Sequence, residues 1–337
     1  MEDDFEQLAD DELLEAISGE RRIKTEFFAD QSQSILATND SPDVPFDFSA
    51  NPYRGCEHGC AYCFARPSHE YLGFNAGLDF ETKIMVKLEA AKLLRDELNK
   101  PAWIGELIAL SGVTDCYQPA ERKFRLTRGL LEVMHEAHQA TTIITKNALV
   151  ARDIDLLGPM AAEKLVHVNL SITTLDAELA RTLEPRTSTP RAKLEAVRKL
   201  AAAGIPTRVM VAPVIPGLTD HEMPKILAAA AEAGAMNASF VLLRLPLAVK
   251  PIFLDWLAVN RPELRDKVEA LIRDTRDGAL YQTEFRVRQR GTGAYAEQIA
   301  QSFQVFRRKH GLDRPMPDYD FTRFTPPQNG SGQMRLF

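Results

Sequence analysis

Five apolar, β-rich runs alternate with segments of helical spacing, and this alternation limits the folds open to the chain more than any other feature. The runs cover residues 104–112, 141–146, 165–173, 207–215 and 238–246, and a shorter run, FDFSA, precedes them at 46–50. Strands that are separated by helices pair in parallel through right-handed crossovers. The sequence therefore predicts six βα units, with ligands gathered at the carboxyl ends of the strands.

Six units are too few for a closed eight-stranded barrel, and no dinucleotide-binding glycine fingerprint follows the first run. We therefore expect an α/β fold of the open, partial (βα)6 barrel type, with a doubly wound sheet as the alternative. Gly204 and Gly234 are expected to end helices, because each stands just before a new strand. Apolar spacing predicts helical faces through three sets of residues: Ile84, Leu88, Ala91, Leu94 and Leu98; Leu130, Met134 and His138; and Ile226, Ala229, Ala230 and Ala233.

Composition divides the chain into four expected regions. Residues 1–45 form an acidic, partly ordered extension, 46–250 the barrel, 251–320 an extension of helices with a strand pair near EFRVRQRG, and 321–337 a flexible tail. The formal net charge is −6, and removing the eight acidic side chains of residues 2–15 leaves about +2 on the rest, which is compatible with a nucleic-acid partner. Neither a membrane span nor a secretory signal is recognisable, so the expected location is the cytoplasm.

Three of the four cysteines stand within eight positions, in the segment NPYRGCEHGCAYCFARP at 51–67. Cys56, Cys60 and Cys63 have the spacing C-x3-C-x2-C, and thiolates suit zinc, copper or iron–sulfur clusters. A zinc site would need a fourth ligand, for which His58, His69 and Cys116 are candidates. A four-iron cluster held by three cysteines would instead leave one iron open to a ligand. Buried or regulatory thiols are the third alternative.

The spacing C-x3-C-x2-C with Tyr62 before its third cysteine, placed after the first strand of a six-fold βα repeat, resembles the radical S-adenosylmethionine (SAM) superfamily. The resemblance covers about residues 46–250. The wider segments NPYRGCEHGCAYCFARPSHE and SGVTDCYQPAE resemble a bacterial subgroup allied to spore photoproduct lyase, the radical enzyme that repairs a thymine dimer.

This resemblance implies that Cys56, Cys60 and Cys63 hold a [4Fe–4S] cluster whose open iron chelates the amino and carboxylate groups of S-adenosylmethionine. One electron, from a donor such as flavodoxin or ferredoxin, would then yield methionine and a 5′-deoxyadenosyl radical that abstracts a hydrogen atom. Damaged DNA or another nucleic acid is the expected substrate. A peptide or small molecule is the alternative, weakly disfavoured because the chain has no additional cysteines for an auxiliary cluster. A non-catalytic, metal-stabilised binding module is the second alternative.

The resemblance also implies a binding site for S-adenosylmethionine. The stretch SGVTD stands where the superfamily binds the methionine amino group with a Gly-Gly-Glu-like sequence, and it departs from that sequence. The implied residues are Ser111, Gly112, Thr114 and Asp115. Ser171 and Thr173 resemble the position that contacts the ribose, although helix capping by the neighbouring Thr174 or Asp176 would explain a polar strand end equally well.

Further polar residues follow the predicted strands and are candidates for substrate contact. Cys116 could return a hydrogen atom to a substrate radical or be an inert buried thiol. Glu121, Lys146 and Arg186 could bind substrate or form ion pairs. Arginines at 286, 288 and 290 would share one face of a strand and could follow a phosphate backbone, or could form a solvated face.

The final five residues, QMRLF, follow a Gly/Ser-bearing stretch. Gln333, Leu336 and Phe337 resemble the peptide that bacterial polymerase and repair proteins insert into the DNA polymerase sliding clamp: a glutamine, two variable residues, then Leu-Phe. A tether with two apolar anchors suits a small pocket on a partner. The alternative is a tail that packs on its own domain.

Overall fold

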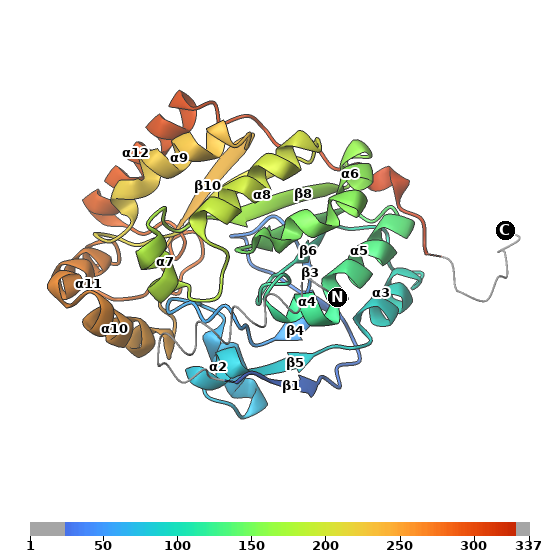
Figure 1. The fold of residues 1–337 in the computed structure, drawn as a ribbon, viewed down its shortest axis with the longest axis horizontal. Coiled ribbons are helices and arrows are strands. Elements are labelled where there is room, and N and C mark those ends of the chain that lie inside the picture. The colour runs from blue at the N-terminus through green and yellow to red at the C-terminus, as the bar shows by residue number, and fades with distance from the viewer. Residues whose placement is uncertain (1–23, 328–337) are drawn as a thin grey trace, which may run out of the picture.

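A computed structural model describes residues 24–327, and a seven-stranded sheet forms its centre (Figure 1). Its strands run in the order β10-β9-β8-β7-β6-β3-β2, and all neighbours pair in parallel except β2 and β3. The strands are β2 (Leu36–Thr38), β3 (Phe48–Ala50), β6 (Ile108–Leu110), β7 (Thr141–Thr145), β8 (Val166–Ser171), β9 (Thr207–Val214) and β10 (Asn237–Leu242).

The strand order confirms the expected α/β partial barrel. The six predicted strands are β3 and β6 to β10, and they lie side by side in sequence order. A doubly wound sheet would reverse direction at a switch point, so that alternative is wrong. Within the described residues β10 does not pair with β2 or β3, and the sheet is therefore open.

Most helices that follow the strands pack against the sheet and bury their apolar faces in the main core (Figure 1), and the others bury theirs in smaller apolar clusters. Gly204 and Gly234 have φ values of 73° and 92°, in the left-handed region, and end two of these helices as predicted. The helices of the barrel are α3 (Ala90–Leu98), α4 (Ala120–Phe124), α5 (Leu126–Glu136), α6 (Ile154–Ala162), α7 (Ala177–Leu183), α8 (Pro190–Ala202) and α9 (Met223–Glu232). Those after β10 are α10 (Val249–Asn260), α11 (Arg265–Asp274) and α12 (Gly293–Lys309).

A second, three-stranded sheet corrects one of the predicted helices. It has the order β1-β5-β4, with β1 (Glu26–Ala29), β5 (Lys83–Val86) and β4 (Tyr53–Arg54), and α2 (Leu78–Thr82) leads into β5. Ile84 belongs to β5, where Ile84 and Val86 are buried and the residues that alternate with them, Lys83 and Met85, are half-buried; the helix α3 begins only at Ala90. The apolar residues at 84 and 88 fit a helical spacing, but the period-two burial of Ile84 and Val86 is that of a strand.

The expected strand pair near EFRVRQRG is also wrong, because residues 285–290 form turns. Arg286 has φ of 67°, and the guanidinium of Arg288 forms an ion pair with Asp43. Although burial opposes it, the Arg286 N–H and the Arg288 guanidinium lower the pKa of the Asp43 carboxyl. The arginines at 286, 288 and 290 therefore do not share a strand face.

After α12 the chain returns along the barrel. Asn237 forms a bridge with Asp313, and the Thr325 N–H donates to the Ala137 carbonyl at 3.0 Å. The clamp-like residues Gln333, Leu336 and Phe337 lie outside the described residues. None of the helices in 24–327 combines the length and apolarity needed to cross a bilayer.

Candidate active site

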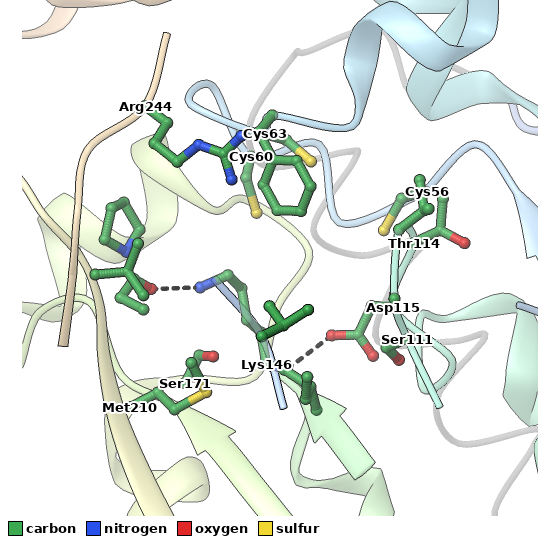
Figure 2. A pocket seen from close by; sticks show the side chains of 18 of the residues that line it. Cys56, Cys60, Cys63, Ser111, Thr114, Asp115, Lys146, Ser171, Met210 and Arg244 are labelled. Carbon is green, nitrogen blue, oxygen red and sulfur yellow. Dashed lines mark hydrogen bonds between the residues drawn. The ribbon is translucent and has the colours of Figure 1, made fainter. Parts of the chain in front are cut away.

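A cavity of about 510 Å³ lies where the strands of the barrel end. One side of it is the loop of residues 55–65, here called the cysteine loop, which follows β4. Figure 2 shows Cys60 and Cys63 near Arg244, Cys56 near Thr114, and Lys146 between these two groups. All three cysteines of the C-x3-C-x2-C motif therefore face one cavity at the predicted edge of the sheet.

The shape of the cysteine loop is set by glycines and by a buried arginine. Gly55 and Gly59 have φ values of 79° and 65°, which favour glycine. The guanidinium of Arg66 donates to the carbonyls of Cys60 and Gly59, both at 3.0 Å, and to Gly77 at 2.8 Å. Arg66 thus fixes the backbone that carries the thiols. Sequence reasoning missed it, although an arginine three residues after the motif was visible.

The three thiols have an environment that suits metal binding once they lose their protons. None forms a disulfide. Burial raises the pKa of each thiol, and the neighbouring thiols raise the pKa of Cys56 and Cys60 further. Opposing this, backbone N–H groups lie against two of the sulfurs, from Asp115 at Cys56 and from Ala65 and Arg66 at Cys63. Such N–H groups stabilise a thiolate and influence a bound cluster.

The donor set fits a cluster in which each thiolate binds its own iron. Within residues 24–327, no three ligating side chains converge on one point as a single ion requires. A four-iron cluster does not need that convergence. The histidine in the loop, His58, is buried, and burial lowers the pKa of His58 to about 4, so its imidazole is neutral near pH 7. Of the other suggested fourth ligands, neither His69 nor Cys116 lines the cavity.

The residues predicted to bind S-adenosylmethionine mostly line the cavity, namely Ser111, Gly112, Thr114, Asp115 and Ser171. Asp115 also has a structural task, because its carboxylate accepts hydrogen bonds from the Thr145 hydroxyl and the Lys146 N–H, both at 2.7 Å (Figure 2). It thereby joins the ends of β6 and β7. Gly112 is required by close approach, since a Cβ there would lie 2.6 Å from the Ser49 side chain.

Thr173 does not line the cavity but belongs to a buried charged network that sequence reasoning missed. Its hydroxyl donates to Glu184 at 2.6 Å, and Tyr62 donates to the same carboxylate. Two ammonium groups pair with the Glu184 carboxylate, that of Lys193 at 2.7 Å and that of Lys146 at 3.4 Å. Although burial alone would raise it, the two ammonium groups hold the pKa of Glu184 below its usual range. Glu184 therefore remains ionised and holds Lys146 at the cavity wall.

Three other candidates lie away from the cavity. Cys116 is fully buried in the main core, so its position gives no support to a hydrogen-donor role. Glu121 is buried as well, accepts from the Thr127 N–H at the start of α5, and pairs with Arg152 at 2.8 Å. Arg186 pairs with Glu81, and neither residue lines the cavity. Glu121 and Arg186 thus form the ion pairs that the sequence offered as the alternative to substrate contact.

Two arginines that sequence reasoning did not place at the site line the cavity. Arg244 follows β10, and Arg288 comes from the turns at 285–290. Arg244 was visible as a charged residue at the end of an apolar run. From its sequence position, Arg288 is predicted only as part of a strand face.

Comparisons with known proteins agree with this architecture. The family model of the radical SAM superfamily matches residues 50–230. An uncharacterised protein of Mycobacterium tuberculosis is 41% identical over 232 residues, which cover 68% of each chain. An uncharacterised protein of Methanocaldococcus jannaschii is 29% identical over 172 residues, covering 51% of this chain and 62% of that protein.

Solved structures of spore photoproduct lyase have a similar fold. The complex with dinucleoside spore photoproduct has a TM-score of 0.57 and 16% identity, covering 84% of this chain and 78% of that one. A variant with bound AdoMet and dinucleoside spore photoproduct has a TM-score of 0.56 and 16% identity, covering 86% and 84%. The chain belongs to the radical SAM superfamily, whose members use a [4Fe–4S] cluster and S-adenosylmethionine.

Proposed function

We propose that this radical SAM enzyme acts on nucleic acid, with damaged DNA as the first candidate and a lyase-like reaction. The charge of the cavity carries the proposal. Lys146, Arg244 and Arg288 line it, whereas Asp115 is the one carboxylate in its lining among the described residues. Such a wall favours an anionic substrate. The likeness in fold to spore photoproduct lyase, solved with a dinucleoside lesion, supports the same substrate class.

The residues of the chain have distinct tasks in this proposal. Cys56, Cys60 and Cys63 would hold the cluster, which with S-adenosylmethionine supplies a 5′-deoxyadenosyl radical after reduction. Asp115 and Ser171 would orient S-adenosylmethionine at the strand ends. Apolar residues of the lining exclude water, which protects reactive species from side reactions. They include Met210, Pro213, Val241 and Leu242.

The proposal is tested by following deuterium. The reconstituted, reduced protein is mixed anaerobically with S-adenosylmethionine and ultraviolet-irradiated oligonucleotides deuterated in thymidine. We expect deuterium in 5′-deoxyadenosine with irradiated DNA and none with the Cys60→Ala variant. Deuterium that arrives only from labelled peptides or small molecules would assign the enzyme to the alternative substrate class. Colourless, zinc-loaded protein that cleaves no S-adenosylmethionine would favour a binding module.

Two partners belong to the same proposal. A small electron-transfer protein such as flavodoxin or ferredoxin would reduce the cluster, and the peptide with Gln333, Leu336 and Phe337 would bind the bacterial sliding clamp. In a pull-down with purified clamp, we expect the wild type to bind and a variant with Leu336→Ala and Phe337→Ala to lose binding. Equal binding by both proteins would exclude this peptide as the contact.

A further inference from the structure

Arg244 differs from the other cations of the cavity because its hydrogen-bonding capacity is largely unused. It stands two residues after the end of β10, on the same side of the cavity as Cys60 and Cys63 (Figure 2). Within the described part of the chain, its side chain donates a single long hydrogen bond, from Nη2 to the Tyr281 hydroxyl at 3.5 Å, and its Nε is buried without a partner. A buried guanidinium N–H without a partner costs free energy unless a ligand satisfies it.

The other two cations already have anionic partners. Lys146 donates to the Ala212 carbonyl at 2.7 Å and lies 3.4 Å from the Glu184 carboxylate. Arg288 pairs with Asp43 and donates to the Ser41 hydroxyl at 2.5 Å. Within residues 24–327, no carboxylate lies within 4.0 Å of the Arg244 guanidinium. Of these three cavity cations, Arg244 is therefore the one that has no carboxylate within 4.0 Å among the described residues, although its charge also acts on Asp43 from a greater distance.

Phe64 and Arg276 also leave the Arg244 guanidinium available to an anion. The Arg244 guanidinium lies 5.2 Å from the centre of the Phe64 ring, which is 47% exposed. Stacking on a ring face leaves the N–H edge of a guanidinium available for a bidentate oxyanion. Arg276 is buried nearby and donates to the Leu243 carbonyl at 2.7 Å. Burial, and then the charge of Arg244, lower the pKa of Arg276 to about 10, so the neighbouring group adds positive charge instead of neutralising it.

We propose that Arg244 binds a phosphate group of the substrate in the cavity and that Phe64 positions its guanidinium for this contact. The proposal rests on the nucleic-acid substrate proposed above and deepens it, because it names the group that is recognised and the residue that recognises it. A guanidinium fork matches the spacing of phosphate oxygens. The carboxylate of S-adenosylmethionine has a similar geometry, so the experiment must separate the two oxyanions.

Anaerobic binding of a fluorescein-labelled, single-stranded thymidine oligonucleotide to the reconstituted protein provides the test, measured by anisotropy over a series of salt concentrations. We expect Arg244→Gln to weaken binding about tenfold, because a charge-assisted hydrogen bond is lost. We also expect the slope of log affinity against log salt to fall by about 0.7, the value for one phosphate contact on a single strand. Arg244→Lys should keep the slope but bind less tightly than the wild type, since it keeps the charge without the fork.

Two control variants distinguish a specific role of Arg244 from the loss of any positive charge. Arg198→Gln removes an exposed arginine of α8 that pairs with Glu195, and it should leave both affinity and slope unchanged. Phe64→Leu should weaken binding with the slope retained, as expected of a positioning residue. Iron content and circular dichroism identify variants that have not folded, and Arg244→Lys then carries the test.

The outcomes separate the two proposals. If the wild type binds the oligonucleotide and Arg244→Gln matches Arg198→Gln in affinity and slope, the role of Arg244 is overturned. The same holds if Arg244→Gln lowers the affinity for S-adenosylmethionine tenfold in equilibrium dialysis while oligonucleotide binding is unchanged, because Arg244 would then serve the other oxyanion. If the wild type itself binds no oligonucleotide, the proposed nucleic-acid function fails, and the role of Arg244 fails with it.

Discussion

The four cysteines of the chain occupy two different settings. Cys56, Cys60 and Cys63 lie on the cysteine loop and line one cavity, whereas Cys116 is packed in the main core between β6 and α4. Burial raises the pKa of all four thiols, so the pKa does not distinguish them. Their positions relative to the cavity do. A motif cysteine and a core cysteine can thus both have a raised thiol pKa and still differ in whether the sulfur reaches the cavity.

The backbone contacts of the two regions differ as well. In the cysteine loop, Arg66 binds carbonyls and leaves the thiols at the cavity. At Cys116, the N–H donates to the Ser111 hydroxyl at 2.7 Å and the carbonyl accepts from Thr127, so this residue links the end of β6 to α5. The first region presents sulfur to a ligand, and the second connects secondary-structure elements.

The largest effect is expected when the cysteine loop loses a thiol. Cys60→Ala removes one of three ligands, so we expect a loss of iron from the protein and a fall of at least about 100-fold in S-adenosylmethionine cleavage, more than is usual when an outer-shell partner is lost. Iron and sulfide analysis and chromatography of 5′-deoxyadenosine measure both quantities. A variant that kept full iron content and cleavage would remove the distinction between the two regions.

The next effect concerns the arginine that holds the loop. Arg66→Met leaves the buried carbonyls of Gly59 and Cys60 without their donors, and we expect the free energy of unfolding to fall by about 3 kcal/mol. Urea unfolding under anaerobic conditions measures this change. The matched control is Arg198→Met on the exposed face of α8. A loss as small as that of the control would show that the loop does not depend on Arg66.

Alanine at either loop glycine would place a Cβ on a residue with a positive φ, and the two positions differ in the atoms that this Cβ would contact. A Cβ at Gly55 would lie 2.9 Å from the Phe80 carbonyl oxygen, which belongs to the backbone. At Gly59 the nearest atoms, Glu81 Oε2 at 2.3 Å and Arg186 Nη2 at 2.4 Å, are ends of side chains that can rotate. We expect losses of about 2 kcal/mol for Gly55→Ala and about 1 kcal/mol for Gly59→Ala in the same unfolding assay. The reverse order would contradict this account.

The smallest effect is expected at the core cysteine. Cys116→Ala removes one buried sulfur atom, so it should lower the free energy of unfolding by about 1 kcal/mol. Iron content and S-adenosylmethionine cleavage should stay within about twofold of the wild type. The discriminating measurement is product formation from a nucleic-acid substrate. If cleavage were normal but the product were lost, Cys116 would regain the hydrogen-donor role that its position does not support.

The six barrel strands could be predicted because each is an apolar run with a clear boundary, such as Gly204 or Gly234 before it. The small sheet could not. Ile84 and Leu88 fit a helix by spacing, and only pairing with β1 and β4 makes residues 83–86 a strand. The prediction of a strand face shared by the arginines at 286, 288 and 290 was wrong for a related reason. Arg288 is held by an ion pair with Asp43, which is far from it in the sequence.

The residues of the candidate site likewise divide into those that could be predicted from the sequence and those that could not. Asp115 and Lys146 could be placed together from the sequence, because parallel strands end at one edge of a sheet. Glu184 could not be recognised, since its importance arises where Lys146, Lys193 and Tyr62 converge on it after folding. The unused hydrogen-bonding capacity of Arg244 is likewise invisible before the partners of every other cation in the cavity are known.

The central claim, that the three loop cysteines leave one iron open to S-adenosylmethionine, is tested most directly by electron–nuclear double resonance. The reduced protein is mixed with S-adenosylmethionine labelled with ¹⁵N at its amino group. We predict a nitrogen coupling to the cluster in the wild type and in Cys116→Ala. A wild-type spectrum with an intact four-iron signal and no such coupling would contradict it.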